Sequence, residues 1–270
     1  MFLRLGCDPE VFLKDAKGNP VSAIGKIGGT KARPKPIKAL NDYYAPDVGI
    51  FAVQEDNVAL EYNTPAAVYS DHWVAYHQKI NSYIDDLLKP MGLKRHIVPC
   101  VEFPESELQT PKAWVFGCEP DYDAWNLQIN PRPESNNRFL RSAGGHIHVG
   151  YAKPSKISSI ELVRLLDVFV GMPMMVAEEP NKRKELYGRA GACRFKPFGV
   201  EYRTPSNFWT AKDSRIKWIF LQAHKALSTM GSSRSLALMN NRDIPEIINK
   251  NDRSGAKTFL EKNGVEPCPL

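Results

Sequence analysis

Residues 144–150 read Gly-Gly-His-Ile-His-Val-Gly and lie within a longer run, residues 141–151, in which apolar and polar side chains alternate. Side chains at positions i and i+2 of a β-strand point to the same face of the sheet. This stretch therefore predicts a strand that presents His146 and His148 together on one face, while the residues between them face a core. The glycines at its entry allow another backbone or a ligand to approach closely.

Three further candidate strands show the same spacing. The functional pairs in them are Asp8 and Glu10, Glu61 and Asn63, and Glu201 and Arg203. Glu55 precedes Glu61 by six positions and has the same parity, so an unbroken strand would place both on one face. One such pair alone is typical of the solvated face of an amphipathic strand. Four pairs of carboxylates, imidazoles and a guanidinium predict a shared site instead, and clustered carboxylates with few histidines are typical of Mg²⁺ or Mn²⁺ sites.

The order of predicted elements favours an α+β fold. We expect strands at residues 2–13, forming a hairpin with 21–24, and at 49–63, 96–101, 141–151 and 198–204. We expect helices at residues 69–90, 157–176 and 212–230, with short helices through 263. Residues 25–38, 104–137 and 180–197 read as connections. Because the strands are unevenly spaced, a mostly antiparallel sheet with helices packed on one face fits better than a doubly wound parallel sheet.

Composition sets the broad class of protein. The 270 residues include 36 Lys+Arg and 30 Asp+Glu, so the formal charge is +6, and 43% are hydrophobic. These values are typical of soluble globular proteins and exclude collagen, fibres and disordered chains. No run approaches the roughly 18 apolar residues of a membrane helix, and a charge interrupts the first residues before a signal-peptide core forms. We therefore expect a cytoplasmic protein with no membrane partner.

The cysteines and the common nucleotide motifs are uninformative or absent. The cysteines are odd in number and widely spaced, at positions 7, 100, 118, 193 and 268, which predicts free thiols rather than disulfides or a zinc site. The sequence contains neither a Gly-x-x-x-x-Gly-Lys-Ser/Thr loop nor a Gly-x-Gly-x-x-Gly motif after a strand. A nucleotide site in this chain would therefore differ from the two commonest phosphate cradles.

Basic residues stand beside two of the acidic motifs. Arg189, Arg194 and Lys196 precede Glu201, and the loop 25–38 carries further cations, namely Lys26, Lys31, Arg33, Lys35 and Lys38. A guanidinium group offers a rigid fork of donors to phosphate oxygens, and metal ions together with arginine neutralise a transferring phosphoryl group. For most of the lysines, a generic basic surface explains the charge equally well.

Four segments occur in a fixed order and carry a resemblance. They are Gly-Cys-Asp-Pro-Glu-Val-Phe at 6–12, Glu-Tyr-Asn-Thr-Pro-Ala at 61–66, the histidine motif at 144–150, and Arg-Phe-Lys-Pro-Phe-Gly-Val-Glu-Tyr-Arg at 194–203. In order and content they resemble the glutamine-synthetase-like carboxylate-amine ligases, which also include glutamate-cysteine ligase. The group they resemble most closely is the phage-type carboxylate-amine ligase (type 2).

The resemblance implies a fold and a domain organisation. It implies a single glutamine-synthetase-like ligase domain over residues 1–270, with core motifs in 5–210 and a helical carboxy-terminal part in 211–270. The antiparallel sheet of such a domain would hold ATP and two or three divalent cations, Mg²⁺ or Mn²⁺, on its concave face. For a phage-encoded protein, the location would be the cytoplasm of the host cell.

The resemblance also assigns roles to particular residues. It implies metal ligands at Asp8, Glu10, Glu61, His146 and Glu201, and ATP contacts at Glu10, Lys31, His148, Arg189 and Arg194. It implies that Arg203, with Arg194 or Arg189, holds the γ-phosphate and an acyl phosphate, while Glu55 or Asp121 accepts a proton from the incoming amine. In two respects the chain departs from the pattern: proline follows the acidic residue at position 8, and residues 25–45 and 104–140 match nothing in glutamine synthetase.

The implied reaction is amide or isopeptide formation driven by ATP. The γ-phosphoryl group would pass to a carboxylate, and an amine would then attack the acyl phosphate to release phosphate. The carboxylate and amine would belong to small molecules or to proteins, and nucleic acid would take part only as a modified-base substrate. The sequence predicts neither the identity of these substrates nor the oligomeric state.

Three other functions remain open at this point. A guanidino kinase of the same fold would stop at phosphoryl transfer, and a divalent-metal hydrolase would act without ATP. A nucleic-acid-binding protein would explain the basic charge, and its affinity would fall steeply with salt. Against the last function stands the absence of a recognition motif or of interleaved aromatic and basic residues.

Overall fold

The computed structural model describes residues 2–42, 49–114, 121–131, 133 and 136–270. It confirms an α+β fold built on antiparallel sheets. The strands are β1 Leu3–Cys7, β2 Glu10–Lys14, β3 Pro20–Val21, β4 Lys35–Pro36, β5 Ala52–Asp56, β6 Ala59–Asn63, β7 Lys94–His96, β8 Cys100–Glu102, β9 Tyr122–Asp123, β10 Gln128–Ile129, β11 Leu140–Ser142, β12 Ile147–Tyr151, β13 Ala192–Lys196 and β14 Gly199–Tyr202. The α-helices are α1 Lys38–Asn41, α2 Ser70–Leu88, α3 Lys156–Leu166, α4 Met172–Ala177, α5 Asp213–Thr229, α6 Ser233–Met239, α7 Asp243–Asn249 and α8 Arg253–Lys262.

Two sheets meet at the start of the chain. The first has the strand order β1-β12-β14-β13-β9-β10, and the second has the order β3-β2-β6-β5-β4 with β7 also paired to β2. Strands β1 and β2 are consecutive in the chain but belong to different sheets, and only Asp8 and Pro9 separate them. Proline has no backbone N–H for a ladder, which suits it to this break between strands. The segment expected as one strand therefore links the two sheets.

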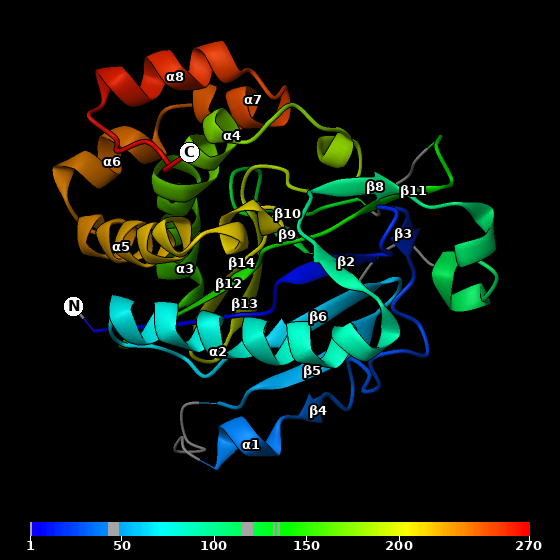
Figure 1. Ribbon diagram of the computed structural model, residues 1–270. Helices are drawn as coiled ribbons and strands as arrows, with labels where there is room; N and C mark the ends of the chain where they lie inside the picture. Colours follow the sequence, from blue (N-terminus) through cyan, green and yellow to red (C-terminus); the bar gives the residue numbers. More distant parts are fainter. Residues whose placement is uncertain (1, 43–48, 115–120, 132, 134–135) are drawn as a thin grey trace.

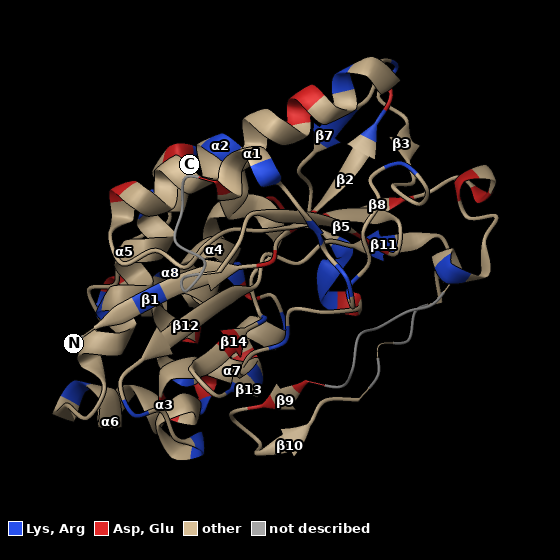
Figure 2. Cartoon of the chain, turned by 90° about the horizontal axis from the view of Figure 1, so that it is seen from below, with Lys and Arg blue, Asp and Glu red and all other residues tan. Residues whose placement is uncertain are grey.

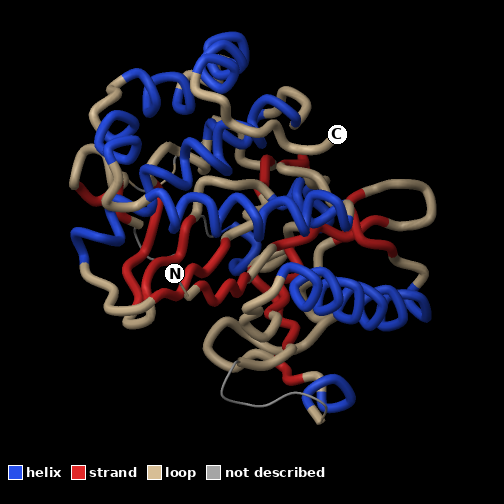
Figure 3. Tube along the Cα trace, turned by 90° about the vertical axis from the view of Figure 1, so that its left-hand side faces the viewer, coloured by secondary structure: helices blue, strands red, loops and turns tan. Residues whose placement is uncertain are grey.

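Helices pack beside and over the strands (Figure 1), and many residues of the hydrophobic core lie on them. One side of α3 is buried through Leu162, Val163 and Leu166, and α3 contacts both β13 and β14 of the first sheet. Helix α2 packs along α5, and its buried Trp73 stacks on Trp209 with ring centroids 5.8 Å apart. Helix α8 packs on α4 and α6 packs on α3, and the carboxy-terminal helices α6 to α8 lie away from the second sheet. Figure 3 shows the strands in the interior, with helices packed above and beside them.

Several predicted segments differ from the observed ones. The strand expected at 141–151 divides between β11 and β12, which belong to different sheets. Residues 49–63 form a hairpin, β5 and β6, which turns at Asn57 with a φ of 56°. The stretch 96–101 divides between β7 and β8, and residues 192–196, expected in a connection, form β13. The alternation in β13 is hidden because its site-facing residues are charged, so the segment reads as a basic loop.

The predicted helices are present, with one interruption. The stretch expected as a helix over 157–176 contains α3 and α4, joined by a π-helical turn at Asp167–Gly171. In the described part of the chain, no helix combines the length and apolar character needed to cross a membrane. Four cysteines are free thiols, at positions 7, 100, 193 and 268, and Cys118 lies outside the described residues.

Candidate active site

The two glycines before His146 shape the entry to β12. Glu10 donates its backbone N–H to the Gly144 carbonyl oxygen at 2.9 Å, and the Gly144 N–H returns a 2.7 Å hydrogen bond to the Glu10 carboxylate. A Cβ atom at Gly144 would overlap the His146 ring, and one at Gly145 would overlap the Ser206 carbonyl oxygen. Glycine at these two positions therefore leaves room for the His146 ring and for the backbone of Ser206.

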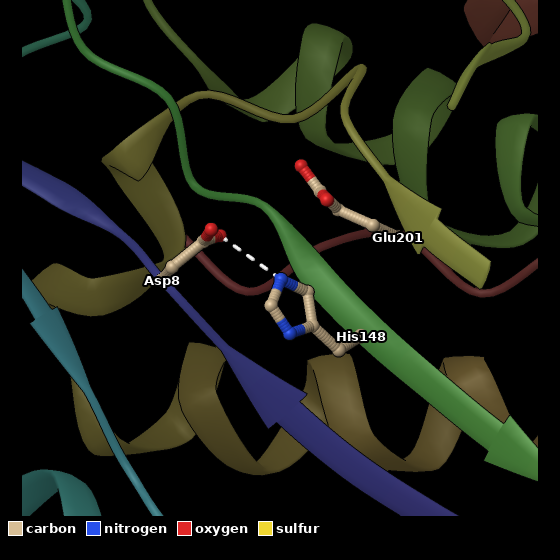
Figure 4. Close-up of side chains that lie close together, drawn as sticks. All are labelled: Asp8, His148 and Glu201. Carbon is tan, nitrogen blue, oxygen red and sulfur yellow. Dashed lines mark ion pairs between the residues drawn. The ribbon is translucent and has the colours of Figure 1, made fainter. Parts of the chain in front are cut away.

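One cluster forms where β1, β12 and β14 lie side by side. Asp8, His148 and Glu201 offer ligand atoms within 4.8 Å of one another. Figure 4 shows His148, on β12, between Asp8 at the end of β1 and Glu201 on β14. His148 Nε2 and His146 Nδ1 lie 3.2 and 3.4 Å from the same oxygen, Asp8 Oδ1. The predicted shared face of the two histidines is confirmed by these contacts.

The charges in this first cluster depend on one another. Burial acts to raise the pKa of Asp8, but His148 and His146 outweigh it and hold the pKa well below its usual value. Burial acts to lower the pKa of His148, and Asp8 outweighs burial so that the pKa is raised. Burial and then Arg203 lower the pKa of His146 to about 4. His146 is thus neutral near pH 7, which is the form of imidazole that binds metal ions.

A second cluster lies on the neighbouring sheet. Glu10 and Glu61 are direct register partners on β2 and β6, and Asp56 ends the adjacent strand β5. Ligand atoms of these three carboxylates also lie within 4.8 Å of one another. Burial and the charge of Asp56 raise the pKa of Glu10 to about 7, and burial, Asp8 and Asp56 raise the pKa of Glu61.

Glu55 does not join the clustered carboxylates. In the β5–β6 hairpin, Gln54 is the register partner of Glu61 and donates a 2.5 Å hydrogen bond to it. Asp56 shares the face of Gln54, whereas Glu55 points to the opposite face and accepts hydrogen bonds from the backbone N–H groups of residues 27 and 28. The expectation that Glu55 and Glu61 share a face was wrong, because the turn at Asn57 reverses the chain between them. Asp56 stands where Glu55 was expected.

Basic side chains compensate both clusters. Arg203 Nη1 pairs with Glu201 Oε1 and lies 3.2 Å from His146 Nδ1, while its Nε lies 3.3 Å from Asp121 Oδ2. Arg194 and Lys196, on β13, reach the Glu201 carboxylate at 3.4 and 2.8 Å. Figure 2 shows basic and acidic positions close together on the paired strands β13 and β14. Burial and Asp8 act to raise the pKa of Glu201, yet Arg203 and the histidines bring it to about 2.

The two remaining predicted cations have different positions. Lys31 Nζ lies 3.2 Å from Asp56 Oδ2, so the basic loop 25–38 does reach the second cluster. Arg189 is exposed, and its backbone carbonyl accepts a 2.8 Å hydrogen bond from Thr204 Oγ1. The structure therefore brings Lys31 to the site and leaves the Arg189 side chain at the surface.

Two cavities adjoin the clusters; members of the second cluster line both, and members of the first line the larger one. The larger has a volume of about 620 Å³ and is lined by residues that include Asp8, Glu61, His148, Lys31, Ile50 and Phe198. The smaller has a volume of about 190 Å³ and is lined by residues that include Glu10, Asp56, His146, Arg203, Arg183 and Lys112. A volume of a few hundred Å³ is typical of small-molecule sites.

The donor atoms fit hard divalent cations. Within the described residues, Asp8 Oδ1 and His148 Nε2 are buried side-chain atoms with no hydrogen-bond partner, and they form an ion pair at 3.2 Å in the first cluster. The second cluster supplies carboxylates alone. Carboxylates with few imidazoles and no thiolate suit Mg²⁺ or Mn²⁺ better than Zn²⁺. The residues present therefore fit Mg²⁺ or Mn²⁺. The histidine of the first cluster is His148, which was expected to contact ATP, and not His146, the expected metal ligand.

Two residues of the candidate site were missed by sequence reasoning. Asp56 was overlooked because Glu55 has the parity of Glu61, although Asp-Asn at 56–57 is a turn signal that could have divided the strand. Arg183 lines the smaller cavity and donates to the carbonyl oxygens of residues 143, 204 and 205. No local pattern separates Arg183 from the other cations of residues 180–197, so only the fold reveals it.

Comparisons with curated proteins and with solved structures give only distant similarities. None of the curated proteins matches the chain. A solved structure described as "GmaS/ADP complex-Conformation 1" is 11% identical, with a TM-score of 0.37, and the alignment covers 97% of this chain and 69% of that one. A second, described as "Crystal structure of novel glutamine synthase homolog", is 10% identical with a TM-score of 0.36, covering 97% and 67%.

The family comparison is more specific. The matched region, residues 136–244, contains His146, His148, Glu201 and Arg203, while Asp8 and Glu10 lie outside it. The model that matches is that of the family described as phage phiEco32-like COOH.NH2 ligase-type 2. Over residues 136–244, the chain is similar to the phage-type carboxylate-amine ligases (type 2), as the four motifs predicted.

Proposed function

We propose that this protein is an ATP-dependent carboxylate-amine ligase that forms an amide or isopeptide bond through an acyl phosphate. One observation supports this most strongly. Asp8 and Glu10, separated by a single proline, place one carboxylate in each of two adjacent clusters, and Arg203 contacts the first cluster and lines a cavity with Glu10. The similarity of residues 136–244 to a ligase family supports the same function.

The proposed roles follow from charge. Mg²⁺ or Mn²⁺ held by Asp8, His148 and Glu201, and by Glu10, Asp56 and Glu61, would neutralise phosphate oxygens and polarise the γ-phosphorus. Arg203 and Arg194 lie beside the first cluster and have guanidinium donors suited to phosphate oxygens. Lys31 supplies a further cation at the second cluster.

The two cavities suggest a division of substrates. We assign the nucleotide to the larger cavity, because its volume of about 620 Å³ and the apolar surfaces of Ile50 and Phe198 suit a base and ribose. We assign the carboxylate substrate to the smaller cavity, where Lys112, Arg183 and Arg203 provide positive charge. Members of the second cluster line both cavities, and Arg203, which pairs with Glu201, lines the smaller one, so the γ-phosphate and the carboxylate would meet beside these residues.

Attack on the acyl phosphate requires a neutral amine, so a base must accept a proton from the ammonium form. Asp121 lies 3.3 Å from Arg203 through its Oδ2 atom, and it therefore stands beside the proposed acyl phosphate. We propose Asp121 as the base that accepts this proton, and not Glu55, whose carboxylate binds the backbone of the 25–28 loop. The amine nitrogen then attacks the acyl carbon, phosphate leaves, and the amide remains. The carboxylate and amine belong to small molecules or to protein side chains.

The test is the substrate dependence of ADP formation. Purified protein is incubated with ATP, Mg²⁺ and a panel of carboxylates and amines, and ADP is measured with each component omitted in turn. A ligase produces sustained ADP only when one carboxylate and one amine are both present. ADP that needs only a guanidino compound indicates a kinase, and an absence of ADP under every condition contradicts the proposal.

A further inference from the structure

The side of the first sheet opposite the proposed site holds a buried carboxylate that the reaction does not use. Asp167 has no solvent exposure and lies on the π-helical turn Asp167–Gly171. Its Oδ1 accepts a 2.6 Å hydrogen bond from the Tyr202 hydroxyl and lies 3.2 Å from Thr204 Oγ1. Its Oδ2 accepts 2.6 Å hydrogen bonds from Trp125 Nε1 and from the Gly191 backbone N–H.

These partners come from three segments that carry site residues. Trp125 follows β9, near Asp121, which contacts Arg203. Gly191 immediately precedes β13, the strand of Arg194 and Lys196. Tyr202 lies in β14, between Glu201 and Arg203 in sequence, and side chains alternate so that Tyr202 points away from the site while its neighbours point toward it. One carboxylate therefore connects the three adjacent strands β9, β13 and β14 from behind.

The local backbone is shaped to allow these contacts. A Cβ atom at Gly171 would overlap the Tyr202 hydroxyl, so glycine at this position of the π-helical turn leaves room for the hydroxyl to reach Asp167. Gly191 has a φ of 71°, and a Cβ there would lie 2.8 Å from Trp125 Cδ1. π-Helical turns inside α-helices are frequent at functional sites. The arrangement thus depends on an uncommon helix geometry and on two glycines.

We infer that Asp167 is a positioning residue for Arg203 and Glu201. Hydrogen bonds from Tyr202, Trp125 and Gly191 to this buried carboxylate hold β14 relative to its neighbours. This in turn sets the direction in which the Arg203 guanidinium and the Glu201 carboxylate leave the strand. Residues that orient metal ligands from behind typically change metal affinity or activity by about 10- to 100-fold when they are replaced. The inference rests on the proposed function for its kinetic readout but not for its metal-binding readout.

The experiment compares Asp167→Asn and Tyr202→Phe with wild-type protein and with Ser235→Ala. Ser235 is a matched control because its buried hydroxyl donates to the Glu161 carboxylate at 2.6 Å, in a network on α3 and α6 outside the proposed site. We expect kcat for ADP formation to fall at least tenfold in Asp167→Asn and at least threefold in Tyr202→Phe, with KM for ATP changed less than kcat. Ser235→Ala is expected to lose stability and retain kcat.

A double-mutant cycle tests whether Asp167 acts through Arg203. If it does, Asp167→Asn combined with Arg203→Lys has nearly the same kcat as Arg203→Lys alone. Tyr202→Phe replaces Asp167→Asn in the cycle if the latter does not fold. Fully additive losses, or a Tyr202→Phe kcat equal to that of Ser235→Ala, would overturn the inference.

A binding measurement separates this inference from the proposed function. Mn²⁺ affinity, measured by electron paramagnetic resonance without ATP, is expected to fall about tenfold in Tyr202→Phe or Asp167→Asn and to stay at the wild-type value in Ser235→Ala. Wild-type protein that forms no ADP contradicts the proposed function alone if the variants still weaken Mn²⁺ binding. Unchanged Mn²⁺ affinity in both variants contradicts the positioning role, whatever the activity.

Discussion

Glu10 and Glu61 are direct partners across the antiparallel strands β2 and β6, so two carboxyl groups face each other on one side of the sheet. Like charges in such a position destabilise a sheet. Here Asp56 adds a third carboxylate, and burial together with these neighbours raises the pKa values of both glutamates. Bound divalent cations would offset the repulsion among these three carboxylates, and this favours a metal site at the second cluster.

The first prediction concerns this pair. Glu61→Gln removes one charge and keeps an oxygen that accepts the hydrogen bond from Gln54. At pH 8 and without metal, we expect the variant to be more stable than wild type by about 1 kcal/mol, or roughly 2 °C in Tm. Mg²⁺ or Mn²⁺ should stabilise wild type and have little effect on the variant. Thermal denaturation with and without each metal checks both expectations.

The control for that measurement is Glu246→Gln. Glu246 forms an exposed ion pair with Lys250 on a helix, so its loss should change stability very little and leave the metal response intact. A Glu61→Gln variant that still gains full stability from Mg²⁺ would argue against a metal site in the second cluster.

The second prediction concerns ATP turnover. Glu10→Gln and Glu201→Gln each remove one carboxylate, from the second and the first cluster respectively. We expect each to lower ADP formation by at least about 100-fold because the phosphates lose a bound cation. Circular dichroism should show an intact fold. Normal turnover in both variants would contradict the assignment of the clusters to catalysis.

The third prediction concerns the guanidinium group of Arg203. Arg203→Lys keeps one positive charge but loses the fork of donors that spans Glu201, Asp121 and His146. We expect kcat to fall by about 10²- to 10³-fold, the cost of losing a donor that stabilises transition-state charge. Arg242→Lys, at an exposed position before α7, is the matched control and should retain full activity. Equal activity of the two variants would remove Arg203 from the mechanism.

The fourth prediction is a pH dependence of stability from a residue behind the site. His77 is fully buried, with Nε2 3.6 Å from Cys7 Sγ and Nδ1 3.2 Å from the Tyr62 hydroxyl. Burial lowers its pKa from 6.5 to about 3. Below pH 6.5 the unfolded chain therefore binds a proton that the folded chain does not, and stability falls as the pH decreases toward 3.

The size of this effect follows from the shift. Between pH 6.5 and 4.5, His77 should cost about 2–3 kcal/mol of unfolding free energy. Urea denaturation of wild type and His77→Gln at these two pH values measures the difference. The variant should lose less stability on acidification, whereas His72→Gln, at an exposed position of the same helix, should behave like wild type. If the unfolding free energy of His77→Gln fell between pH 6.5 and 4.5 as much as that of wild type, another group would be responsible for the pH dependence.

Periodicity and motif order predicted much of the site. The i, i+2 spacing predicted which side chains share a face. The contacts of His146 and His148 with Asp8 and the ion pair of Arg203 with Glu201 confirm this prediction. Such local rules hold wherever the strand is unbroken. The resemblance to phage-type ligases likewise needed only the order of short motifs, and the match over residues 136–244 confirms it.

The errors arose where the chain changes direction. Because the chain turns at Asn57, Asp56 and not Glu55 lies in the cluster with Glu61. Because the strand breaks at Pro9, Asp8 and Glu10 belong to different clusters. A one-residue change of register moves a side chain to the other face, so a missed turn reverses every assignment beyond it. Asp167 could not be found from sequence at all, since its partners lie 24 to 42 residues away and only the fold brings them together.

The most direct test of the central claim is hydroxylamine trapping of an acyl phosphate. The protein is incubated with ATP, Mg²⁺, hydroxylamine and a panel of carboxylates, and hydroxamate and ADP are measured together. The proposed function predicts hydroxamate that depends on ATP and on one class of carboxylate, in a one-to-one ratio with ADP, and that is lost in Arg203→Lys. ADP formed without hydroxamate, by a protein supplied with its carboxylate substrate, would contradict acyl-phosphate chemistry.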